Sequence, residues 1–306
     1  MKVIVFGGSG FLGSHVADAL SEEGHMVAIY DLKESEYLKP NQEMIVGDIL
    51  DEQHINKAVK GVDVVFNFAG IADIDDASCK PVETVKYNIL GNTIILEASK
   101  ANKVKRFVFA STIYVYSDSG SFYRCSKSAC ELYVESYQKK FGLDYTILRY
   151  GTIYGCRADM RNSVYRYLYQ ALTEGKITYY GDGTEIREYI NVIDAAENSV
   201  QILADEYENQ NILFTGHHPM KVSELFKMIK EMLNKDIIIE YKEPESDDPE
   251  SHYTMTPYKF IPKMGRKLVS HYYTDMGQGI LLCMQEIHDQ KQLCQGGQDL
   301  KTNSGE

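Results

Sequence analysis

The sequence is poor in the features that mark membrane proteins. Its 306 residues include no tryptophan and only seven prolines, and no stretch approaches 18 consecutive apolar residues. The N-terminal run MKVIVF meets glycines after six residues, which is too short for a signal peptide or a membrane span. We therefore expect a cytoplasmic protein that has no membrane partner.

Basic residues are in deficit: 32 lysines and arginines stand against 44 aspartates and glutamates, a formal net charge of -12. Nucleic acid or an anionic membrane would select a basic face, so we expect neither as a partner. An anionic small molecule is not excluded, because it needs only a local cluster of arginines and lysines. The six cysteines show no CxxC motif and no zinc-ligand spacing, which predicts reduced cytosolic thiols and no metal site.

Short apolar runs alternate with helical patterns in the first half of the chain. With 44% apolar and 25% charged residues, the composition is that of a globular protein. Strands that alternate with helices predict a parallel sheet covered by helices on both faces. The expected strands are residues 3–6, 27–30, 44–46, 64–67, 106–110 and 145–148, and the expected helices are residues 15–23, 82–101 and 126–141.

A glycine-rich loop, Gly7 to Gly13, stands between the first strand and the first helix. Gly7 permits a tight turn, Gly10 lets backbone N–H groups approach a pyrophosphate, and Gly13 allows the helix to pack closely on the strand. The diphosphate would lie at the positive end of the helix, beside Phe11 and Leu12. The pattern predicts a dinucleotide site; the alternative is a purely structural glycine turn.

Acidic and small residues follow the next strands. Asp31 ends the second strand, 18 residues after Gly13, where its carboxylate can accept hydrogen bonds from ribose hydroxyls and repel a 2′-phosphate. This favours NAD over NADP, although Lys33 nearby argues mildly against it. Further cofactor contacts are expected at Leu32, at Asp48 and Ile49 beside adenine, and at Phe68, Ala69 and Gly70, where small residues let a dinucleotide pass.

We expect an α/β fold with a Rossmann-type doubly wound parallel sheet and a smaller C-terminal α/β substrate domain. Residues 1–155, with 188–212 returning to them, would form the NAD-binding domain, and 156–187 with 213–288 the substrate domain. Helices are expected at 161–174, 192–206 and 222–233, and a strand at 177–181. Residues 242–263 are expected to be irregular, and 289–306, which have no periodic apolar face, to form a disordered tail.

At this point the sequence resembles the extended short-chain dehydrogenase/reductase family, the NAD-dependent epimerases and dehydratases of nucleotide sugars. The resemblance covers roughly residues 1–215 and is carried by GGSGFLG, NFAG, the helix ASCKPVETVKYNILGNTIILEAS, FVFASTIYVYS, YRCSK, LRYGTIYG and YYGDGTEIREYINVIDAA. It implies NAD as cofactor, Asn88 as a support of the catalytic centre, Thr112, Tyr123 and Lys127 as catalytic residues, and Tyr150 beside the cofactor. It also implies that Arg187 contacts a substrate phosphate.

Tyr123 and Lys127 are four residues apart, so on a helix they share a face. An ammonium group there would stabilise tyrosinate and lower the tyrosine pKa from its usual value of about 10. Lys127 could also hold the nicotinamide ribose, and Thr112 would orient the sugar hydroxyl. Tyr123 would take the hydroxyl proton while hydride leaves the sugar carbon. Without the motifs before it, the pair would be two polar residues of an ordinary helix.

Basic side chains gather in residues 157–187 of an otherwise acidic chain. Such a cluster can bind a nucleoside diphosphate through charge-assisted hydrogen bonds; the alternative for two or three members is an exposed helix face. We expect Arg187 and Arg157 to bind substrate, together with Thr152, which stands where relatives have asparagine. The cluster contains Arg157, Arg161, Arg166, Lys176 and Arg187.

Two departures from the family narrow the chemistry. Thr112 is followed by Ile113 and Tyr114, which cannot do the acid–base work of a dehydratase. Only eleven positions separate Thr112 from Tyr123, so the turn SDSGSF should leave the sugar side open. We expect His252, Tyr253, Tyr258 and Lys263 to be structural.

The expected function is NAD-dependent hydride transfer at C4 of a nucleoside-diphosphate sugar, by a 4-epimerase or 4-dehydrogenase in surface-polysaccharide precursor synthesis. A GDP-hexose or GDP-heptose is suggested by the short turn. The alternatives are an NAD(P)H-dependent 4-keto-sugar reductase and a non-catalytic NAD-binding regulator. The resemblance also implies a homodimer or higher homo-oligomer through residues 82–101 and 126–141.

Overall fold

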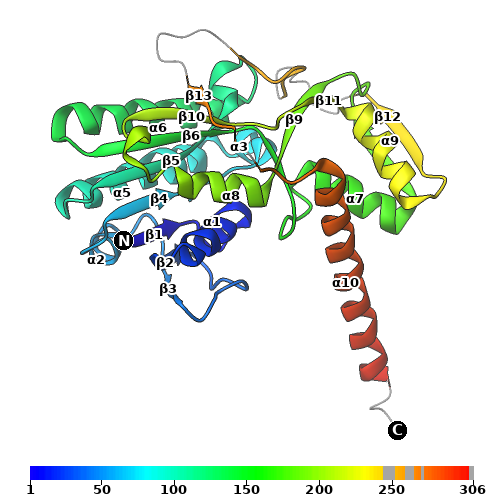
Figure 1. Ribbon diagram of the computed structural model, residues 1–306, viewed down its shortest axis with the longest axis horizontal. Coiled ribbons are helices and arrows are strands. Elements are labelled where there is room, and N and C mark those ends of the chain that lie inside the picture. Colours follow the sequence, from blue (N-terminus) through cyan, green and yellow to red (C-terminus); the bar gives the residue numbers. More distant parts are fainter. Residues whose placement is uncertain (244–251, 259–264, 270–271, 303–306) are drawn as a thin grey trace.

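The computed structural model describes residues 1–243, 252–258, 265–269 and 272–302. Its centre is a sheet in which eight described strands run parallel, in the order β13-β10-β6-β5-β4-β1-β2-β3 (Figure 1). The order reverses between β1 and β4, and the carboxyl ends of strands at such a point form the usual dinucleotide crevice. The strands are β1 (Lys2–Phe6), β2 (Met26–Asp31), β3 (Gln42–Val46), β4 (Val64–Asn67), β5 (Arg106–Thr112), β6 (Asp144–Tyr150), β10 (Gln210–Phe214) and β13 (Arg266–Lys267).

Helices cover both faces of the sheet and bury two apolar cores. On one face α1 (Phe11–Glu22) and α8 (Val192–Gln201) pack through residues such as Leu20 and Ala195. On the other face α2 (Glu52–Ala58), α5 (Gly91–Ala101) and α6 (Ser121–Phe141) pack through residues such as Ile95 and Val134. The predicted Rossmann-type doubly wound sheet is confirmed. Between β4 and α5 lie α3 (Ile74–Cys79), α4 (Pro81–Thr84) and the π-helix η1 (Val85–Leu90).

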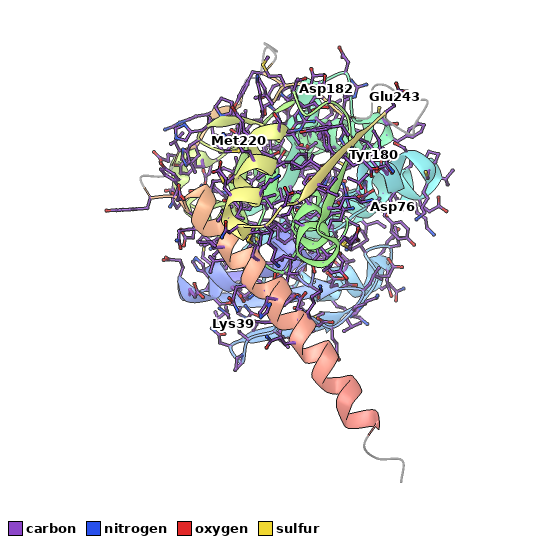
Figure 2. The ribbon with its side chains drawn as sticks, turned by 90° about the vertical axis from the view of Figure 1, so that its right-hand side faces the viewer. Lys39, Asp76, Tyr180, Asp182, Met220 and Glu243 are labelled. Atoms are coloured by element: carbon purple, nitrogen blue, oxygen red, sulfur yellow. The ribbon has the colours of Figure 1, made fainter. Side chains whose placement is uncertain are left out.

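A smaller part of the chain packs beside the carboxyl ends of the strands, around a third core that includes Leu168, Phe226 and Ile280. Figure 2 faces this part, with Tyr180, Asp182 and Met220 on its surface. Its elements are the sheet β11-β9-β7 (Pro219–Lys221, Ile186–Asn191, Thr152–Tyr154), the sheet β12-β8 (Ile238–Lys242, Lys176–Tyr180), and the helices α7 (Ser163–Glu174), α9 (Val222–Leu233) and α10 (Met276–Thr302).

The C-terminal third departs from the sequence prediction at two places. β13 pairs with β10 in the central sheet, so residues 265–269 do not lie in the small domain; a strand of two residues leaves no readable pattern. The expected disordered tail is wrong for residues 289–302, because α10 continues as helix to Thr302. The first half of α10 buries Ile280, Cys283 and Ile287, whereas its end projects from the body (Figure 1). Residues 303–306 lie outside the described residues.

Two smaller differences bear on the site. α6 begins at Ser121, not at residue 126, because Gly120 takes the left-handed conformation (φ 97°) that starts the helix early. Tyr123 therefore lies in its first turn. In the region expected to be irregular, residues 252–258 form no regular element and make one bridge, between Ile186 and Met255, while Lys263 lies outside the described residues.

Among the helices described here, none combines the length and the apolar character that crossing a membrane requires.

Candidate active site

The glycine loop after β1 is shaped by contacts that only glycine permits. Gly7 has a φ of 75°, and a Cβ atom on it would lie 2.7 Å from the amide nitrogen of Ala69. A Cβ atom on Gly13 would lie 2.2 Å from the carbonyl oxygen of Gly7, so α1 starts directly against the turn. Gly10 caps α1 without a side-chain hydrogen bond, which leaves the first N–H groups of the helix unpaired by side chains. These residues fit a bound diphosphate.

Asp31, at the end of β2, lies beside this loop. Its Oδ2 accepts a hydrogen bond of 3.0 Å from the backbone N–H of Ser9, and the Ser9 hydroxyl donates to the carbonyl of Lys33. One carboxylate oxygen thus fixes the loop. The other has no hydrogen bond among the described residues, and its bond from a ribose hydroxyl stays a prediction. Leu32 is exposed next to it.

The residues after β3 are divided between the surface and the core. The Asp48 carboxylate accepts a hydrogen bond from the backbone N–H of Leu50, and the Asp48 carbonyl accepts one from Tyr30. Ile49 is buried against α5, where a Cβ atom on Gly91 would lie 2.6 Å from its Cδ1. The Ile49 side chain therefore belongs to the core. The predicted contact of this side chain with adenine is corrected: only the Ile49 backbone could make such a contact.

Asn88 joins the loop after β4 to the helix that carries the predicted catalytic pair. Its side chain bonds both the N–H and the carbonyl of Ile71, and it donates to the Ser126 hydroxyl at 2.9 Å. Gly70 leaves room for it, since a Cβ atom there would lie 2.6 Å from Asn88 Oδ1. Asn88 lies in the π-helix, a distortion that is frequent at functional sites. Asn88 thus ties Ile71 to Ser126 on α6, and its role as a support of the catalytic centre stays a prediction.

Thr112, Tyr123 and Lys127 meet at the carboxyl end of β5. The Tyr123 hydroxyl is hydrogen-bonded to the Thr112 side chain. The Lys127 ammonium donates to the carbonyl of Ala110 at 2.8 Å and lies 5.8 Å from the centre of the Tyr123 ring. Thr112 and Lys127 are buried, and Tyr123 is partly exposed to the surface. The structure thus brings together three side chains that are spread over fifteen positions of the sequence, from Thr112 to Lys127.

Burial decides the protonation of the pair in the protein alone. It raises the pKa of Tyr123 to about 12, against a smaller lowering by the Thr112 hydrogen bond. Burial also lowers the pKa of Lys127 to about 8, which the charges of Cys130 and Glu131 partly oppose. Our expectation that Lys127 would lower the Tyr123 pKa is therefore wrong for the protein alone. The Lys127 ammonium donates to the Ala110 carbonyl and lies over the Tyr123 ring, and burial of Tyr123 is the largest effect on its pKa.

The basic cluster disperses in the fold, and Arg187 is the member that stacks on Tyr253, whose ring lies beside Tyr114. Its guanidinium carbon lies 4.4 Å from the centre of the Tyr253 ring, and in the described residues it forms no ion pair. Arg157 is a correction: it pairs with Asp18 on α1 at 2.7 Å and stacks on Tyr37, so it ties a loop to the cofactor domain. The other members interact with nearby residues. Arg161 forms an ion pair with Asp159 and Lys176 one with Glu240, and Arg166 donates a hydrogen bond to the Met160 carbonyl.

Two further predicted contacts are corrected. Tyr150 is buried between Phe68 and Phe214, and its hydroxyl bonds Ser199 at 2.6 Å, so its side chain belongs to the core. The Thr152 hydroxyl bonds the Tyr253 hydroxyl at 3.2 Å, so that in this conformation it faces residues 252–258.

The packing of residues 252–258 against Tyr114, next to Tyr123, was not predicted from the sequence. The Tyr114 hydroxyl bonds His252 Nδ1 at 2.9 Å, and the Tyr114 ring lies 4.8 Å from that of Tyr253 and 6.4 Å from that of Tyr123. The short turn packs against Tyr114, since a Cβ atom on Gly120 would lie 2.6 Å from its ring. The open sugar side stays a prediction. The aromatic content of HYTMTPY was the available signal. Tyr258, by contrast, is structural, bonding Glu188 and Thr215.

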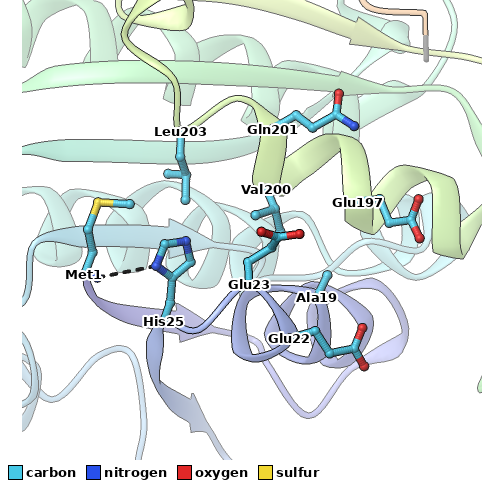
Figure 3. A pocket seen from close by; sticks show the side chains of 9 residues that line it. All are labelled: Met1, Ala19, Glu22, Glu23, His25, Glu197, Val200, Gln201 and Leu203. Carbon is cyan, nitrogen blue, oxygen red and sulfur yellow. Dashed lines mark hydrogen bonds between the residues drawn. The ribbon is translucent and has the colours of Figure 1, made fainter. Parts of the chain in front are cut away.

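A separate cavity of about 450 Å³ lies at the other end of α1 (Figure 3). Glu22, Glu23 and Glu197 give it an acidic lining, and the N-terminal ammonium contacts His25 at 3.4 Å. It includes none of the residues above, so we do not assign it to the active site.

Comparisons with known proteins agree with this geometry. The model of the NAD dependent epimerase/dehydratase family matches residues 3–213. The chain is 32% identical over 246 residues to the UDP-N-acetyl-alpha-D-glucosaminuronate decarboxylase of Bacillus cytotoxicus, covering 72% of this chain and 76% of that protein. UDP-glucose 4-epimerase of Thermotoga maritima, solved with UDP-glucose, superposes with a TM-score of 0.82 at 26% identity over 95% of this chain and 99% of that one. UDP-N-acetylglucosamine 4-epimerase of Methanobrevibacter ruminantium gives 0.81 at 26% identity, over 94% and 98%.

Proposed function

Because the chain belongs to the NAD dependent epimerase/dehydratase family and is an NAD-dependent enzyme, we propose that it is a 4-epimerase of a UDP-sugar. The observation that carries the proposal is the contact of Tyr123 with Thr112 above the buried Lys127, beside a glycine loop that fits a diphosphate. The 4-epimerases that it resembles support the reaction and the uridine nucleotide.

The residues would divide the chemistry as follows. Bound NAD would supply the acceptor for hydride and, by its charge, favour ionised Tyr123. Thr112 would hold the C4 hydroxyl of the sugar, and Tyr123 would take its proton. Lys127 would keep the tyrosinate stable as the proton moves, while Arg187 would bind the diphosphate. Rotation of the 4-keto sugar would then let hydride return to the opposite face of C4, while Tyr123 gives its proton back to the oxygen, and the product would be the C4 epimer.

The same geometry argues against an acid–base step beyond C4. Ile113 begins the short 3-10 helix η2 (Ile113–Tyr116) and is buried, and Tyr114 is bonded to His252, so no carboxylate follows Thr112. This disfavours dehydration. A 4-dehydrogenase, or action on a GDP-hexose or GDP-heptose, is the secondary proposal, since Tyr114 and Tyr253 give the sugar side unusual walls. A 4-keto-sugar reductase would need exchangeable NAD(P)H, and a non-catalytic regulator would have no need of the Tyr123–Lys127 pair.

We also propose a homodimer formed by η1 and α6. Both elements present large apolar side chains to solvent, among them Val85, Leu90 and Leu132, of which Leu132 is 65% exposed. A second copy would bury them. Six cysteines without CxxC or zinc-ligand spacing favour a cytoplasmic setting. Synthesis of surface-polysaccharide precursors is the pathway we propose.

Two measurements test the proposal. One sample of the purified protein is denatured and the released cofactor is identified, and a second, native sample is screened with UDP-, GDP-, dTDP- and CDP-sugars. We expect NAD in the supernatant and a UDP-sugar converted to its C4 epimer at unchanged mass. Tyr123→Phe should abolish turnover and keep NAD. Loss of two hydrogens from the product would instead indicate a dehydrogenase, and wild-type turnover of Tyr123→Phe would overturn the proposal.

A further inference from the structure

Three consecutive residues of β5 each contact one residue of α6, and the three α6 residues follow one another at intervals of four positions. Thr112 bonds Tyr123, the Ala110 carbonyl accepts from Lys127, and the Ser111 hydroxyl donates to Glu131. Positions i, i+4 and i+8 lie along one face of a helix. Glu131 is therefore the third member of the contact that sets α6 on β5, although it does not touch the candidate substrate space.

Glu131 is held in place by Arg149, the residue opposite Ser111 on the neighbouring strand β6. The Arg149 guanidinium donates to both carboxylate oxygens, from Nε at 2.9 Å and from Nη2 at 2.6 Å. Its third nitrogen donates to the Tyr116 hydroxyl, which also accepts from the N–H of Gly265. The Glu131 carboxylate thus has two anchors, Ser111 on β5 and Arg149 on β6.

This ion pair is out of water: the side chains of Arg149 and Glu131 are 2% and 9% exposed. A buried pair gives little net stability, because desolvation offsets the attraction, and the best-attested use of such pairs is to fix a structural register. The bidentate geometry, which allows one orientation of the carboxylate, suits that use.

Glu131 also contributes to the charge around Lys127. On their shared helix the Tyr123 ring lies 5.8 Å from the Lys127 ammonium, and the charges of Cys130 and Glu131 both raise the Lys127 pKa against the larger effect of burial. From β5, the Ala110 carbonyl accepts its hydrogen bond and the Phe109 ring lies 5.0 Å from it.

We propose that Glu131, anchored by Ser111 and Arg149, is a positioning residue that holds Tyr123 and Lys127 in their working geometry. The inference rests on the proposed function for the roles of these two residues. A misplacement of about 1 Å at a reacting group can cost about a hundredfold in rate. Nothing in the contacts of Glu131 places it on substrate or cofactor, so its loss should act on kcat and not on KM.

Two variants test the proposal. Glu131→Gln keeps the shape but removes the carboxylate charge that raises the pKa of Lys127, so that pKa should fall further and the alkaline limb of kcat should move to lower pH. Ser111→Ala removes one anchor without leaving a buried charge, so it should fold normally and lose kcat with KM unchanged. Glu208→Gln is the matched control, because it breaks the Arg106–Glu208 pair at the other end of β5. It should match the wild type in kcat and pH profile.

The Lys127 titration is followed independently of turnover. The protein is labelled with ¹³C-lysine, the NMR chemical shift of Lys127 Cε is measured against pH, and the signal that is missing in Lys127→Arg identifies Lys127. A lower Lys127 pKa in Glu131→Gln with a fall in kcat of about a hundredfold supports the proposal. An unmoved Lys127 titration in Glu131→Gln overturns the proposal. Wild-type kcat in Ser111→Ala also overturns it, and this second result decides even where Glu131→Gln does not fold. If Tyr123→Phe is active, the proposed function fails instead, while the titration still decides whether Glu131 controls Lys127.

Discussion

The Arg187 guanidinium carbon lies 4.4 Å from the centre of the Tyr253 ring. Tyr253 belongs to residues 252–258, which pack against Tyr114. A guanidinium stacked on a ring keeps its N–H edge available for an anion. Tyr253 thus fixes the cation that we assign to the diphosphate, and also contacts Tyr114 and Thr152.

Arg187→Ala should therefore weaken substrate binding. A hydrogen bond to a charged group contributes about 1.5–3 kcal/mol, so KM for the UDP-sugar should rise roughly tenfold to a hundredfold while NAD content stays the same. Steady-state kinetics and the absorbance of released NAD check this. Arg161→Ala is the control, since Arg161 is exposed and paired with Asp159. An equal loss in both variants would remove Arg187 from the substrate site.

Gly13→Ala should abolish NAD binding. The new Cβ atom would lie 2.2 Å from the Gly7 carbonyl, which forces α1 and the loop apart. The measurement is the NAD content of the purified variant, with its free energy of unfolding. Gly142→Ala serves as control: that position has a φ of 70° but open space, so it should cost about 1–2 kcal/mol of stability with full NAD content. Full NAD content in Gly13→Ala would contradict the assigned loop.

Asp31→Ala should shift cofactor preference from NAD toward NADP. It removes the carboxylate that would accept ribose hydroxyls, repel a 2′-phosphate and hold the Ser9 N–H. Calorimetric titration of the cofactor-free protein with both nucleotides checks this, and exposed Glu34→Ala provides the control for charge alone. An unchanged ratio of the two dissociation constants would show that Asp31 only supports the loop.

Lys127 makes activity and stability depend on pH in opposite ways. Its pKa is lowered by burial from 10.5 to about 8, so the folded state binds fewer protons than the unfolded state between these values. The free energy of unfolding should therefore rise with pH across this window, by up to about 3 kcal/mol relative to Lys127→Met. Tyr123, whose raised pKa of about 12 affects stability only above its unfolded value of 10, does not interfere.

Turnover should fall over the same window, because neutral Lys127 no longer stabilises tyrosinate. Denaturant unfolding of both proteins at pH 7 and pH 10 measures the stability effect. A difference between the wild type and Lys127→Met that is independent of pH would mean that Lys127 titrates normally.

The parts of the site that depend on local spacing were predictable from the sequence. Gly7 and Gly13, Asp31, and the Tyr123–Lys127 pair each act through a turn, a strand end or one helical turn, whose geometry follows from neighbouring residues. The parallel sheet was predictable for the same reason, since each of its first six strands is a distinct apolar run.

The parts that depend on long-range contacts were not. His252 reaches Tyr114 across 138 positions, and Arg157 meets Asp18 across 139. Nothing near Arg157 in the sequence distinguishes an arginine that pairs with α1 from one that binds phosphate. Tyr150 and Ile49 were assigned to the cofactor by motif, yet their side chains complete cores formed by distant helices.

The most direct test of hydride transfer at C4 follows a label. The protein, with its own NAD, is incubated in ordinary water with a UDP-sugar that carries deuterium at C4, and the product is examined by NMR and mass. Our account predicts the C4 epimer with the deuterium retained at C4, because hydride passes to NAD and returns without exchange. Replacement of that deuterium by solvent hydrogen, in an epimerised product, would contradict it.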